Sequence, residues 1–416
     1  MLIHWIWLAT RPHLTDRAKA MLLQHFRDPE DIFFADRESF AHIDGMTREG
    51  AEALSDKDLH QAEKILTDCA REKVHVLTFR DANYPSRLRH IADPPLVLYY
   101  KGNLPDFDGS PLISVVGTRK ASGYGLQMAR QLGYQIAKCG AVVVSGIAEG
   151  IDAAAMQGAL TAGSPVVGIL GNGADVVYPP CNRGLYLDTE RYGCLIGEYP
   201  PGTEPFRWNF PRRNRIISGI SCGVLVVEAP KKSGSLITAN QALEQGRDVF
   251  VLPGNVDNPG FEGSLNLLRE GGIPVRNGWD VMSEYAALYP DKIRRDTTEL
   301  PYPEKSGKAA REAEKPSGKV AQATALPMGK GRKNEKSNKK VVDNAEQQTY
   351  SDVNKDLPKL TDEQRAIVAA LQGGERLVDD VIAQLELPAH KVSSALTMLA
   401  IKGIVKKLPG NRIALK

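Results

Sequence analysis

The 416-residue chain has few cysteines and histidines, and it has no long hydrophobic run. Its five cysteines are scattered and include no C-x-x-C pair, which argues against a disulfide framework and a zinc site. No histidine lies between residues 100 and 290, which excludes a His-based triad or metal cluster there. No apolar run reaches the length of about 18 residues that suggests a membrane span. The N-terminus lacks the basic start of a signal peptide, so we expect a cytoplasmic protein.

Charge is nearly balanced over the whole chain, at +3, but it is unevenly distributed. Residues 304–340 carry 11 lysines and arginines against four acidic residues. Residues 291–357 are poor in large apolar side chains, so they predict a disordered basic linker that cannot bury enough area to fold. Such a linker can add nonspecific affinity for nucleic acid. A solvated tether without a binding role is an equally good interpretation.

Residues 1–85 predict a helical N-terminal domain, because apolar residues recur at helical spacing through 18–26 and 59–70. The stretch IDGMTREG at 43–50 resembles the turn of a helix-hairpin-helix or SAM-like domain, in which glycines let backbone amides approach phosphates. Plain packing of two helices around a turn remains the alternative.

Residues 86–290 predict a second domain in which short apolar runs alternate with helical stretches. We expect strands at 112–116, 141–145, 165–170, 194–197, 224–228, 249–252 and 273–275. Helices are expected near 123–138, 149–162, 182–192, 212–221, 235–246 and 262–270. This alternation is typical of an α/β fold, a Rossmann-like doubly wound parallel sheet. Such sheets bind ligands at the carboxyl ends of their strands.

Residues 358–416 predict a winged-helix domain. TDEQ at 361–364 is a capping box that opens a helix, and 378–385 and 392–401 are two further apolar-periodic helices. Two short strands around a Pro-Gly-Asn turn follow within 404–415. His390 and Lys391 are the polar residues near the start of the supposed recognition helix. Such modules bind duplex DNA or proteins, and the sequence favours neither.

Four glycine-containing loops follow strands at the same predicted edge of the sheet. They are GTRKASGYG (117–125), SGIAEGID (145–152), GNGAD (171–175) running into YPPCNR (178–183), and SGSLIT (233–238). A helix that starts after such a loop directs free amides toward a phosphate. Neither a Walker A sequence nor G-x-G-x-x-G occurs. One such loop is common in any α/β protein, but four together predict a site for several phosphates.

The stretch FRWNFPRRNR at 206–215 joins these loops. Arginines fork to phosphate oxygens, and aromatic faces stack on bases, which together predict a groove for single-stranded nucleic acid. The candidate faces are Tyr124, Tyr178, Phe206, Trp208 and Phe210. We expect one or two of the arginines to touch nucleic acid and another to pin the loop to a carboxylate such as Glu198 or Glu228. A solvated helix that happens to carry arginines is the alternative.

Five carboxylates are candidates for a catalytic role: Glu149, Asp152, Asp175, Glu198 and Glu228. No two of them form a convincing acid–base pair. Helix capping, favourable interaction with the helix dipole, or loop support is the preferred interpretation of each.

Seven stretches carry a resemblance to a known family. They are YPSRLRHIADPPLVLYYKG (84–102), VVGTRKASGYG (115–125), VVSGIAEGID (143–152), GNGADVVYPPCN (171–182), GEYPPGTEPFRWNFPRRNRIISGIS (197–221), VVEAPKKSGSLITANQALEQGRDVFVLPG (226–254) and GSLNLLREGG (263–272). The chain resembles the bacterial DNA-processing protein A family (DprA, also called Smf). The resemblance covers nearly all of residues 84–275, and both flanks resemble the family's optional domains.

This resemblance implies a dimer that binds and protects single-stranded DNA and loads the RecA recombinase onto it in natural transformation and recombination. It implies no catalysis and no nucleotide cofactor. By position, the family's DNA pocket falls on Gly117, Thr118, Arg119, Ser145, Gly146, Asn182, Arg183, Phe210, Arg212, Arg213, Asn214 and Arg215. The glycine loops add Lys120, Ser233, Gly234 and Ser235 to the predicted DNA-binding residues. The implied dimer interface lies near 250–275, and we place it on Leu265, Leu267 and Leu268. Pro180 and Cys181 depart from what a DNA-binding loop would favour, because neither is basic.

Two other functions compete with this one. LOG-type phosphoribohydrolases share a similar fold, but they carry PGGxGT followed by a glutamate. The corresponding loop here reads KSGSLIT and is followed by Ala239 and Asn240, so that catalytic signature is missing. The third possibility is a transcriptional regulator that binds DNA through the winged helix.

Overall fold

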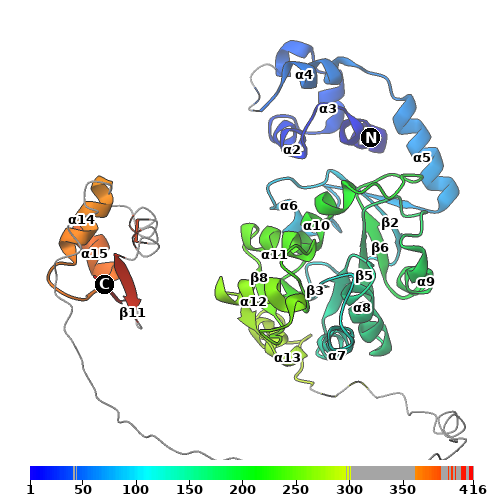
Figure 1. Ribbon diagram of the computed structural model, residues 1–416. Coiled ribbons are helices and arrows are strands. Elements are labelled where there is room, and N and C mark those ends of the chain that lie inside the picture. Colours follow the sequence, from blue (N-terminus) through cyan, green and yellow to red (C-terminus); the bar gives the residue numbers. More distant parts are fainter. Residues whose placement is uncertain are drawn as a thin grey trace, which may run out of the picture. The chain divides into compact units, whose positions relative to one another are not determined.

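The computed structural model describes residues 1–40, 43, 45–296, 298, 300, 361–385, 392, 395, 396, 399, 404–408 and 412–415. The chain forms two compact units, Met1–Glu314 and Lys315–Lys416 (Figure 1). Nearly all of the predicted linker, together with His390 and Lys391, lies outside the described residues.

A nine-stranded sheet organises the first unit, in the order β1-β2-β6-β5-β4-β3-β7-β8-β9. Its strands are β1 (His75–Thr78), β2 (Val97–Gly102), β3 (Leu112–Val116), β4 (Val142–Ser145), β5 (Val166–Leu170), β6 (Cys194–Gly197), β7 (Gly223–Val226), β8 (Asp248–Val251) and β9 (Ile273–Pro274). Strands β3 to β9 run parallel to one another, which confirms the predicted doubly wound sheet. The first of them, β3, lies between β4 and β7.

Two antiparallel strands extend this sheet beyond the prediction. β1 pairs with β2, and β2 pairs with β6. The expectation that residues 1–85 are entirely helical is therefore wrong at β1. This edge strand has only four residues, and it is held by pairing Leu77 with Leu98 rather than by a long apolar run. The sheet begins at His75, before the domain boundary predicted at residue 85.

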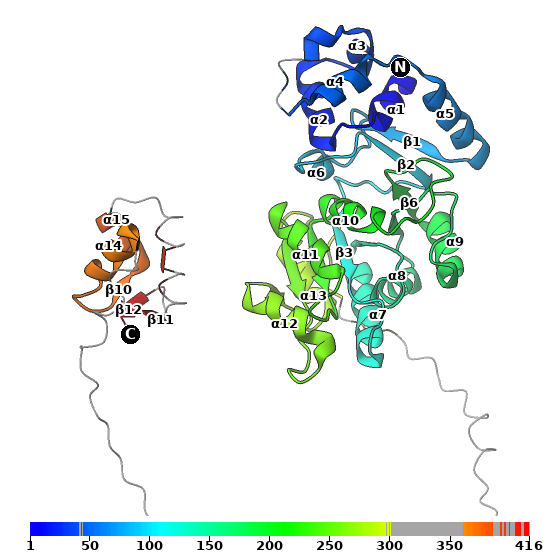
Figure 2. The same ribbon diagram turned by 45° about the horizontal axis from the view of Figure 1, so that its top comes forward.

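Helices cover both faces of the sheet. One layer contains α7 (Gly123–Lys138), α8 (Ile151–Thr161), α9 (Arg183–Tyr192) and α13 (Gly278–Met282). The other contains α6 (Ser86–Arg89), α10 (Asn209–Ile220), α11 (Ser235–Glu244) and α12 (Glu262–Arg269). Side chains of β3 alternate between the two cores, with Ile113 in the first and Leu112 in the second. In Figure 2, α7 and α8 lie on one side of β3 and α11 on the other.

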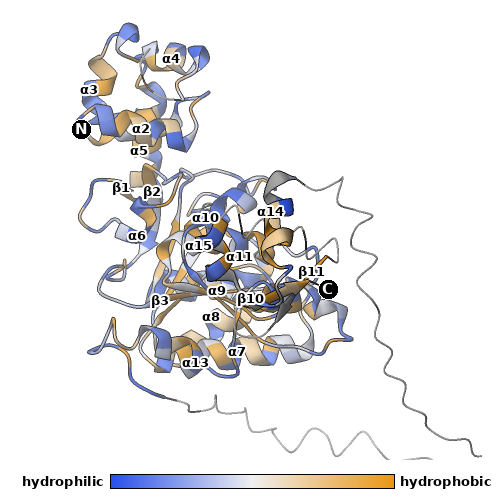
Figure 3. Cartoon of the chain, turned by 90° about the vertical axis from the view of Figure 1, so that its left-hand side faces the viewer, coloured by the Kyte–Doolittle hydropathy of each residue, from blue (hydrophilic) through white to orange (hydrophobic). Residues whose placement is uncertain are grey.

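Five short helices form the N-terminal part of the same unit. They are α1 (Leu2–Thr10), α2 (Asp16–His25), α3 (Pro29–Phe34), α4 (Arg48–Ser55) and α5 (His60–Glu72), with the 3-10 helix η1 (Arg37–Phe40) before α4. Trp7, Leu22 and Phe40 are fully buried among them. In Figure 3 the helices, such as α2 and α7, carry both hydrophilic and hydrophobic residues. Part of the stretch at 43–50 lies outside the described residues, so its likeness to a helix-hairpin-helix turn stays a prediction.

The second unit has several of the predicted winged-helix elements, whereas most of the predicted helix at 392–401 lies outside the described residues. Thr361 and Gln364 form the expected capping box at the start of α14 (Asp362–Ala370). α15 (Val378–Leu385) follows the short strand β10 (Arg376–Leu377), and β11 (Val405–Leu408) and β12 (Arg412–Leu415) form the expected antiparallel pair. The strand β10, which was not predicted, completes a three-stranded sheet. Within the residues described for both units, no helix has the length and apolarity needed to cross a membrane.

Candidate functional site

A groove opens at the carboxyl ends of β3 and β7. After β3 the chain enters α7 in one layer, and after β7 it enters α11 in the other, so the two connections leave in opposite directions. This is the switch point at which doubly wound sheets bind ligands. The groove has a volume of about 820 Å³. Its lining consists of residues 116–120, Ala148, Asp152, Tyr178, Arg207, Phe210, Pro211, Arg213, Asn214, Ile217, Pro230, Lys232, Ser233, Gly234, Ser235, Ile237, Thr238, Pro259 and Gly260.

A smaller cavity of about 190 Å³ adjoins this groove and shares six residues with it: Arg119, Lys120, Ala148, Tyr178, Phe210 and Arg213. Its remaining lining comes from the second and third glycine loops and from Leu170 at the end of β5. Three of the four loops, those after β3, β4 and β5, thus meet at this cavity, while the loop after β7 lines the larger groove. The predicted convergence of the four loops is confirmed.

Arg119 is an exposed cation at the centre of the site. Its loop is fixed by backbone hydrogen bonds, since Thr118 N donates to Glu228 O at 2.7 Å and Ile151 N donates to Thr118 O at 3.3 Å. The guanidinium lies 5.6 Å from the centre of the Phe210 ring. Neither Arg119 nor Lys120 forms an ion pair with any described residue, so both charges are available to a ligand.

Phe210 occupies the first turn of α10, which begins at Asn209, earlier than the predicted start at 212. The earlier start fits the sequence, because a proline is tolerated in the first turn, where its missing N–H has no helical partner. The ring of Phe210 lies 5.4 Å from that of Tyr178, and Arg213 approaches it at 5.7 Å. Phe210 is therefore partly buried by cations and an aromatic neighbour, and it lines the groove.

Arg213 is buried and binds the protein itself. Its guanidinium donates to the carbonyl of Gly146 at 3.0 Å and to the carbonyl of Ile169. Burial lowers the pKa of Arg213 to about 10, although nearby Asp152 opposes this shift. Burial raises the pKa of Asp152, whose carboxylate accepts a hydrogen bond from Gly146 N at 3.1 Å. A side chain at Gly146 would come within 2.5 Å of Arg213, so this contact requires glycine.

Arg212 and Arg215 belong to an ion-pair cluster that binds α10 to the N-terminal helices. Arg215 is 3% exposed and pairs with Asp16 at 2.9 Å, Asp93 at 3.0 Å and Glu198 at 2.5 Å. Arg212 pairs with Asp16 at 2.5 Å and Glu198 at 3.0 Å. The expectation that one arginine pins its segment to Glu198 is confirmed. Neither arginine is among the residues that line the groove.

Glu228 supports the first loop, because its carboxylate accepts hydrogen bonds from Ser122 N at 3.1 Å and from Ser122 Oγ at 2.7 Å. Asp175 likewise accepts from Gly202 N at 2.9 Å. These contacts agree with the loop-support interpretation of Glu228 and Asp175. Glu149, by contrast, is exposed and lines the smaller cavity. Among the described residues, no group of three or more His, Cys, Asp or Glu side chains could hold a metal ion.

The other predicted DNA-binding residues divide into two groups. Gly117, Asn214, Ser233, Gly234 and Ser235 line the groove together with Thr118 and Lys120. Ser145 is fully buried and donates to Val115 O at 2.6 Å. Asn182 donates to Ile147 O at 2.9 Å, which holds the second loop in place. Neither Asn182 nor Arg183 lines the groove.

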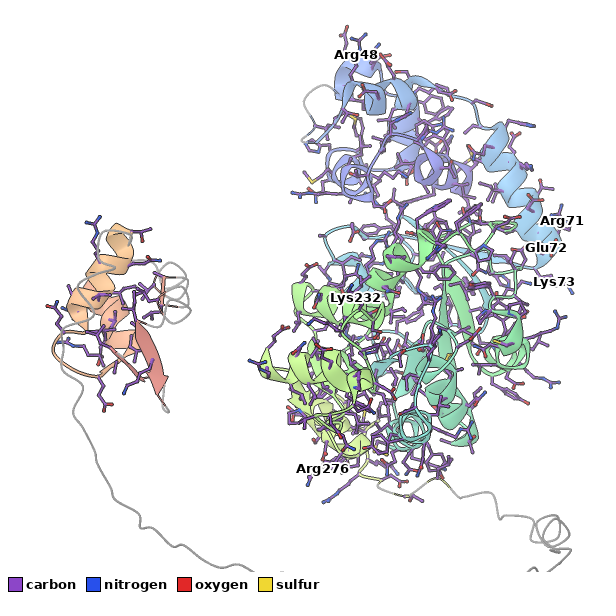
Figure 4. All side chains as sticks on the ribbon, viewed as in Figure 1. Arg48, Arg71, Glu72, Lys73, Lys232 and Arg276 are labelled. Carbon is purple, nitrogen blue, oxygen red and sulfur yellow. The ribbon has the colours of Figure 1, made fainter. Side chains whose placement is uncertain are left out.

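Two basic residues of the groove were not among the predicted site residues. Arg207 comes from the segment before α10, and Lys232, labelled in Figure 4, comes from the loop before α11. Both are exposed. Lys232 could have been found from its position, because the pair Lys231-Lys232 follows the end of the buried strand β7 after four intervening residues.

The predicted dimer residues lie on α12. Leu267 is 4% exposed and packs into the core beneath the sheet of its own chain, while Leu268 packs against that core from its edge. Leu265 is half-buried. Of the three residues, Leu265 is therefore the best placed to meet a second copy, and the dimer itself stays a prediction.

Comparisons with known proteins agree with these features. The family model described as DNA recombination-mediator protein A matches residues 75–286, and that described as the DprA winged helix domain matches residues 354–411. Protein Smf from Synechocystis is 32% identical over 396 residues, which covers 94% of this chain and 93% of that protein. DNA processing protein DprA from Bacillus subtilis is 38% identical over 53% of this chain and 74% of its own length. The X-ray structure of DprA from Streptococcus pneumoniae superposes with a TM-score of 0.61 at 33% identity, over 68% of this chain and 98% of that one.

Proposed function

Because this chain belongs to the DNA-processing protein A (DprA/Smf) family, we propose that its groove binds single-stranded DNA and that the bound strand is passed to the RecA recombinase. In this role it protects incoming DNA during natural transformation and recombination. The protein acts by binding rather than by catalysis.

The observation that carries the proposal is the charge of the groove. Arg119, Lys120, Arg207 and Lys232 are exposed cations along its lining, and the carboxylate of Asp152 is buried against Gly146 N. An open groove with several separate cations matches a polyanion better than a single phosphate. Phe210 and Tyr178 add aromatic faces beside the cations, which is the combination used for single strands.

The proposal that nothing is catalysed rests on the same lining. Among the described residues that line the groove, Asp152 is the one carboxylate, and it holds the second loop. The adjoining cavity adds exposed Glu149, whose carboxylate accepts a hydrogen bond from Cys181 Sγ at 3.3 Å. A phosphoribohydrolase would need a free acid at this place. The hand-over to RecA is supported by the family's description as a recombination mediator. It predicts that the chain accelerates RecA assembly on an oligonucleotide.

A fluorescence-anisotropy titration with a labelled single-stranded oligonucleotide tests the binding, with duplex of equal length as the competitor. We expect the duplex to compete poorly, because stacking on Phe210 and Tyr178 needs unpaired bases. Affinity should fall as salt rises, with a slope of about −0.7 per neutralised phosphate. Equal competition by duplex, or an affinity independent of salt, would contradict the proposal.

Deleting residues 358–416 separates this proposal from a winged-helix regulator. The groove lies wholly within the first unit, so the shortened chain should keep most of its affinity for single strands. A regulator that reads DNA through its winged helix should lose that affinity. The same anisotropy titration gives the answer.

A further inference from the structure

Phe206 and Trp208 form a stacked aromatic pair on the surface, in the segment between β6 and α10. Their ring centres lie 4.8 Å apart and the ring planes differ by 4°. Trp208 is 70% exposed and Phe206 is 41% exposed. Each ring covers one face of the other, and Trp208 remains largely exposed to water. Large aromatic rings usually dominate the buried parts of proteins and interfaces, and an exposed pair therefore indicates a binding role.

The segment that carries the pair is well fixed. Its hydrogen bonds to the third glycine loop run from Gly173 N to Thr203 O at 2.9 Å and from Gly202 N to the Asp175 carboxylate at 2.9 Å. At its far end, Asn209 Nδ2 donates to Gly171 O at 2.9 Å. Binding to a fixed pair costs little conformational entropy, because the backbone is already ordered and each ring restrains the other.

The pair is continuous with the groove. Arg207, between the two rings in sequence, lines the groove, as do Phe210 and Pro211 just after them. Neither Phe206 nor Trp208 is part of that lining. The aromatic pair therefore lies next to the groove, because the residue between the two rings in sequence is a cation that lines it.

We propose that Trp208, backed by Phe206, stacks on a base of single-stranded DNA where the strand leaves the groove, while Arg207 contacts the adjoining phosphate. This inference rests on the proposed function and extends its site beyond the groove. Single-stranded DNA suits the pair because every base has a π-face, so stacking is tolerant of sequence. The neighbouring cation also suits a strand in which phosphates alternate with bases.

The first test replaces Trp208 by leucine and measures affinity for two oligonucleotides of equal length, one normal and one abasic. The abasic strand keeps its phosphates but offers no base. Trp208→Leu should bind the normal strand about tenfold more weakly, in line with about 1–3 kcal/mol per stacked base. It should bind the abasic strand as well as the wild type does. Trp208→Phe should keep most of the affinity, which also guards against a folding defect in the leucine variant.

The second test follows tryptophan fluorescence during the same titration. Trp5 and Trp7 are buried among the N-terminal helices, whereas Trp208 is the most exposed of the four tryptophans. The oligonucleotide should quench the wild-type signal, and Trp208→Phe should abolish the quenching. Trp279→Phe is the matched control, because it removes a partly buried tryptophan on α13 and should leave the quenching intact.

The outcomes separate this inference from the proposed function. If the wild type binds single strands, yet Trp208→Leu binds them equally well and no quenching occurs, the proposed stacking on Trp208 is wrong. The proposal that the groove binds single-stranded DNA is then unaffected. If Trp208→Leu weakens both oligonucleotides equally, stacking is likewise overturned. If the wild type binds neither oligonucleotide, the proposed function is wrong, and the proposed stacking on Trp208 is wrong with it.

Discussion

Arg213 holds together the ends of two neighbouring strands. Its partners are the carbonyl of Gly146, which directly follows β4 and lines the smaller cavity, and the carbonyl of Ile169, near the end of β5. Its position in the sequence, within a run of arginines, gives no sign of this. The sequence does not distinguish arginines 212, 213 and 215, because the burial and the partners of each are set by residues far away in the sequence. Asp16 of the N-terminal helices, for example, is 199 residues from Arg215.

Replacing Arg213 by methionine should destabilise the protein by about 3 kcal/mol or more, because it leaves Asp152 buried without its compensating cation. Urea denaturation of the variant and the wild type measures this difference. The exposed Arg119→Ala variant is the control and should unfold at nearly the wild-type midpoint. An Arg213→Met variant of normal stability that no longer binds DNA would show that Arg213 contacts the ligand instead.

The ion-pair cluster joins two elements, α2 and α10. Asp16 begins α2, and it meets Arg212 and Arg215 of α10. Burial alone would raise the pKa of Asp16, but the two arginines outweigh it and hold that pKa below its ordinary value. The unfolded chain therefore binds a proton at this site more readily than the folded chain. Ionised Asp16 thus stabilises the fold above pH 4, and its contribution is lost as the pH falls through the lowered pKa.

Replacing Asp16 by asparagine should cost about 2 kcal/mol at neutral pH, the magnitude of a hydrogen bond to a charged group. The difference from the wild type should stay constant down to about pH 4 and shrink below it, as the wild-type carboxylate is protonated. Urea denaturation at a series of pH values measures both features. Asp188→Asn, an exposed aspartate on α9, is the control and should show neither. A constant difference down to pH 2 would contradict the role of the charge.

At the scale of elements, the sequence predicts those strands and loops whose formation depends on the local pattern of apolar residues and glycines. The parallel strands inside the sheet are short apolar runs because both of their faces are covered, and all seven parallel strands were found from such runs. β1 was missed because a four-residue edge strand is determined by its pairing partner. The convergence of the glycine loops could also be predicted, since carboxyl ends of parallel strands share one edge. Which side chains of those loops face the groove could not, because that depends on packing between loops.

For the molecule as a whole, the predicted dimer needs a surface that its own chain leaves free. Leu267 is occupied by the core, so a charge there would test folding rather than association. Leu265→Lys is the better probe. If α12 forms the interface, this variant should sediment as a monomer while the wild type sediments as a dimer. Exposed Leu187→Lys, on α9, is the control and should leave the mass unchanged. An unchanged sedimentation profile for Leu265→Lys would move the interface away from this helix.

The central claim is that the groove at the β3–β7 switch point binds single-stranded DNA, and Arg119 tests it most directly. Arg119→Ala removes an exposed, unpaired cation without disturbing the backbone bonds of Thr118. Its affinity for a single-stranded oligonucleotide, measured by anisotropy, should fall about tenfold or more, because a charge-assisted hydrogen bond contributes about 1.5–3 kcal/mol. Arg191→Ala, at the end of α9 and outside the groove lining, is the matched control and should bind like the wild type. Unchanged affinity in Arg119→Ala, or an equal loss in Arg191→Ala, would contradict the assignment of this groove.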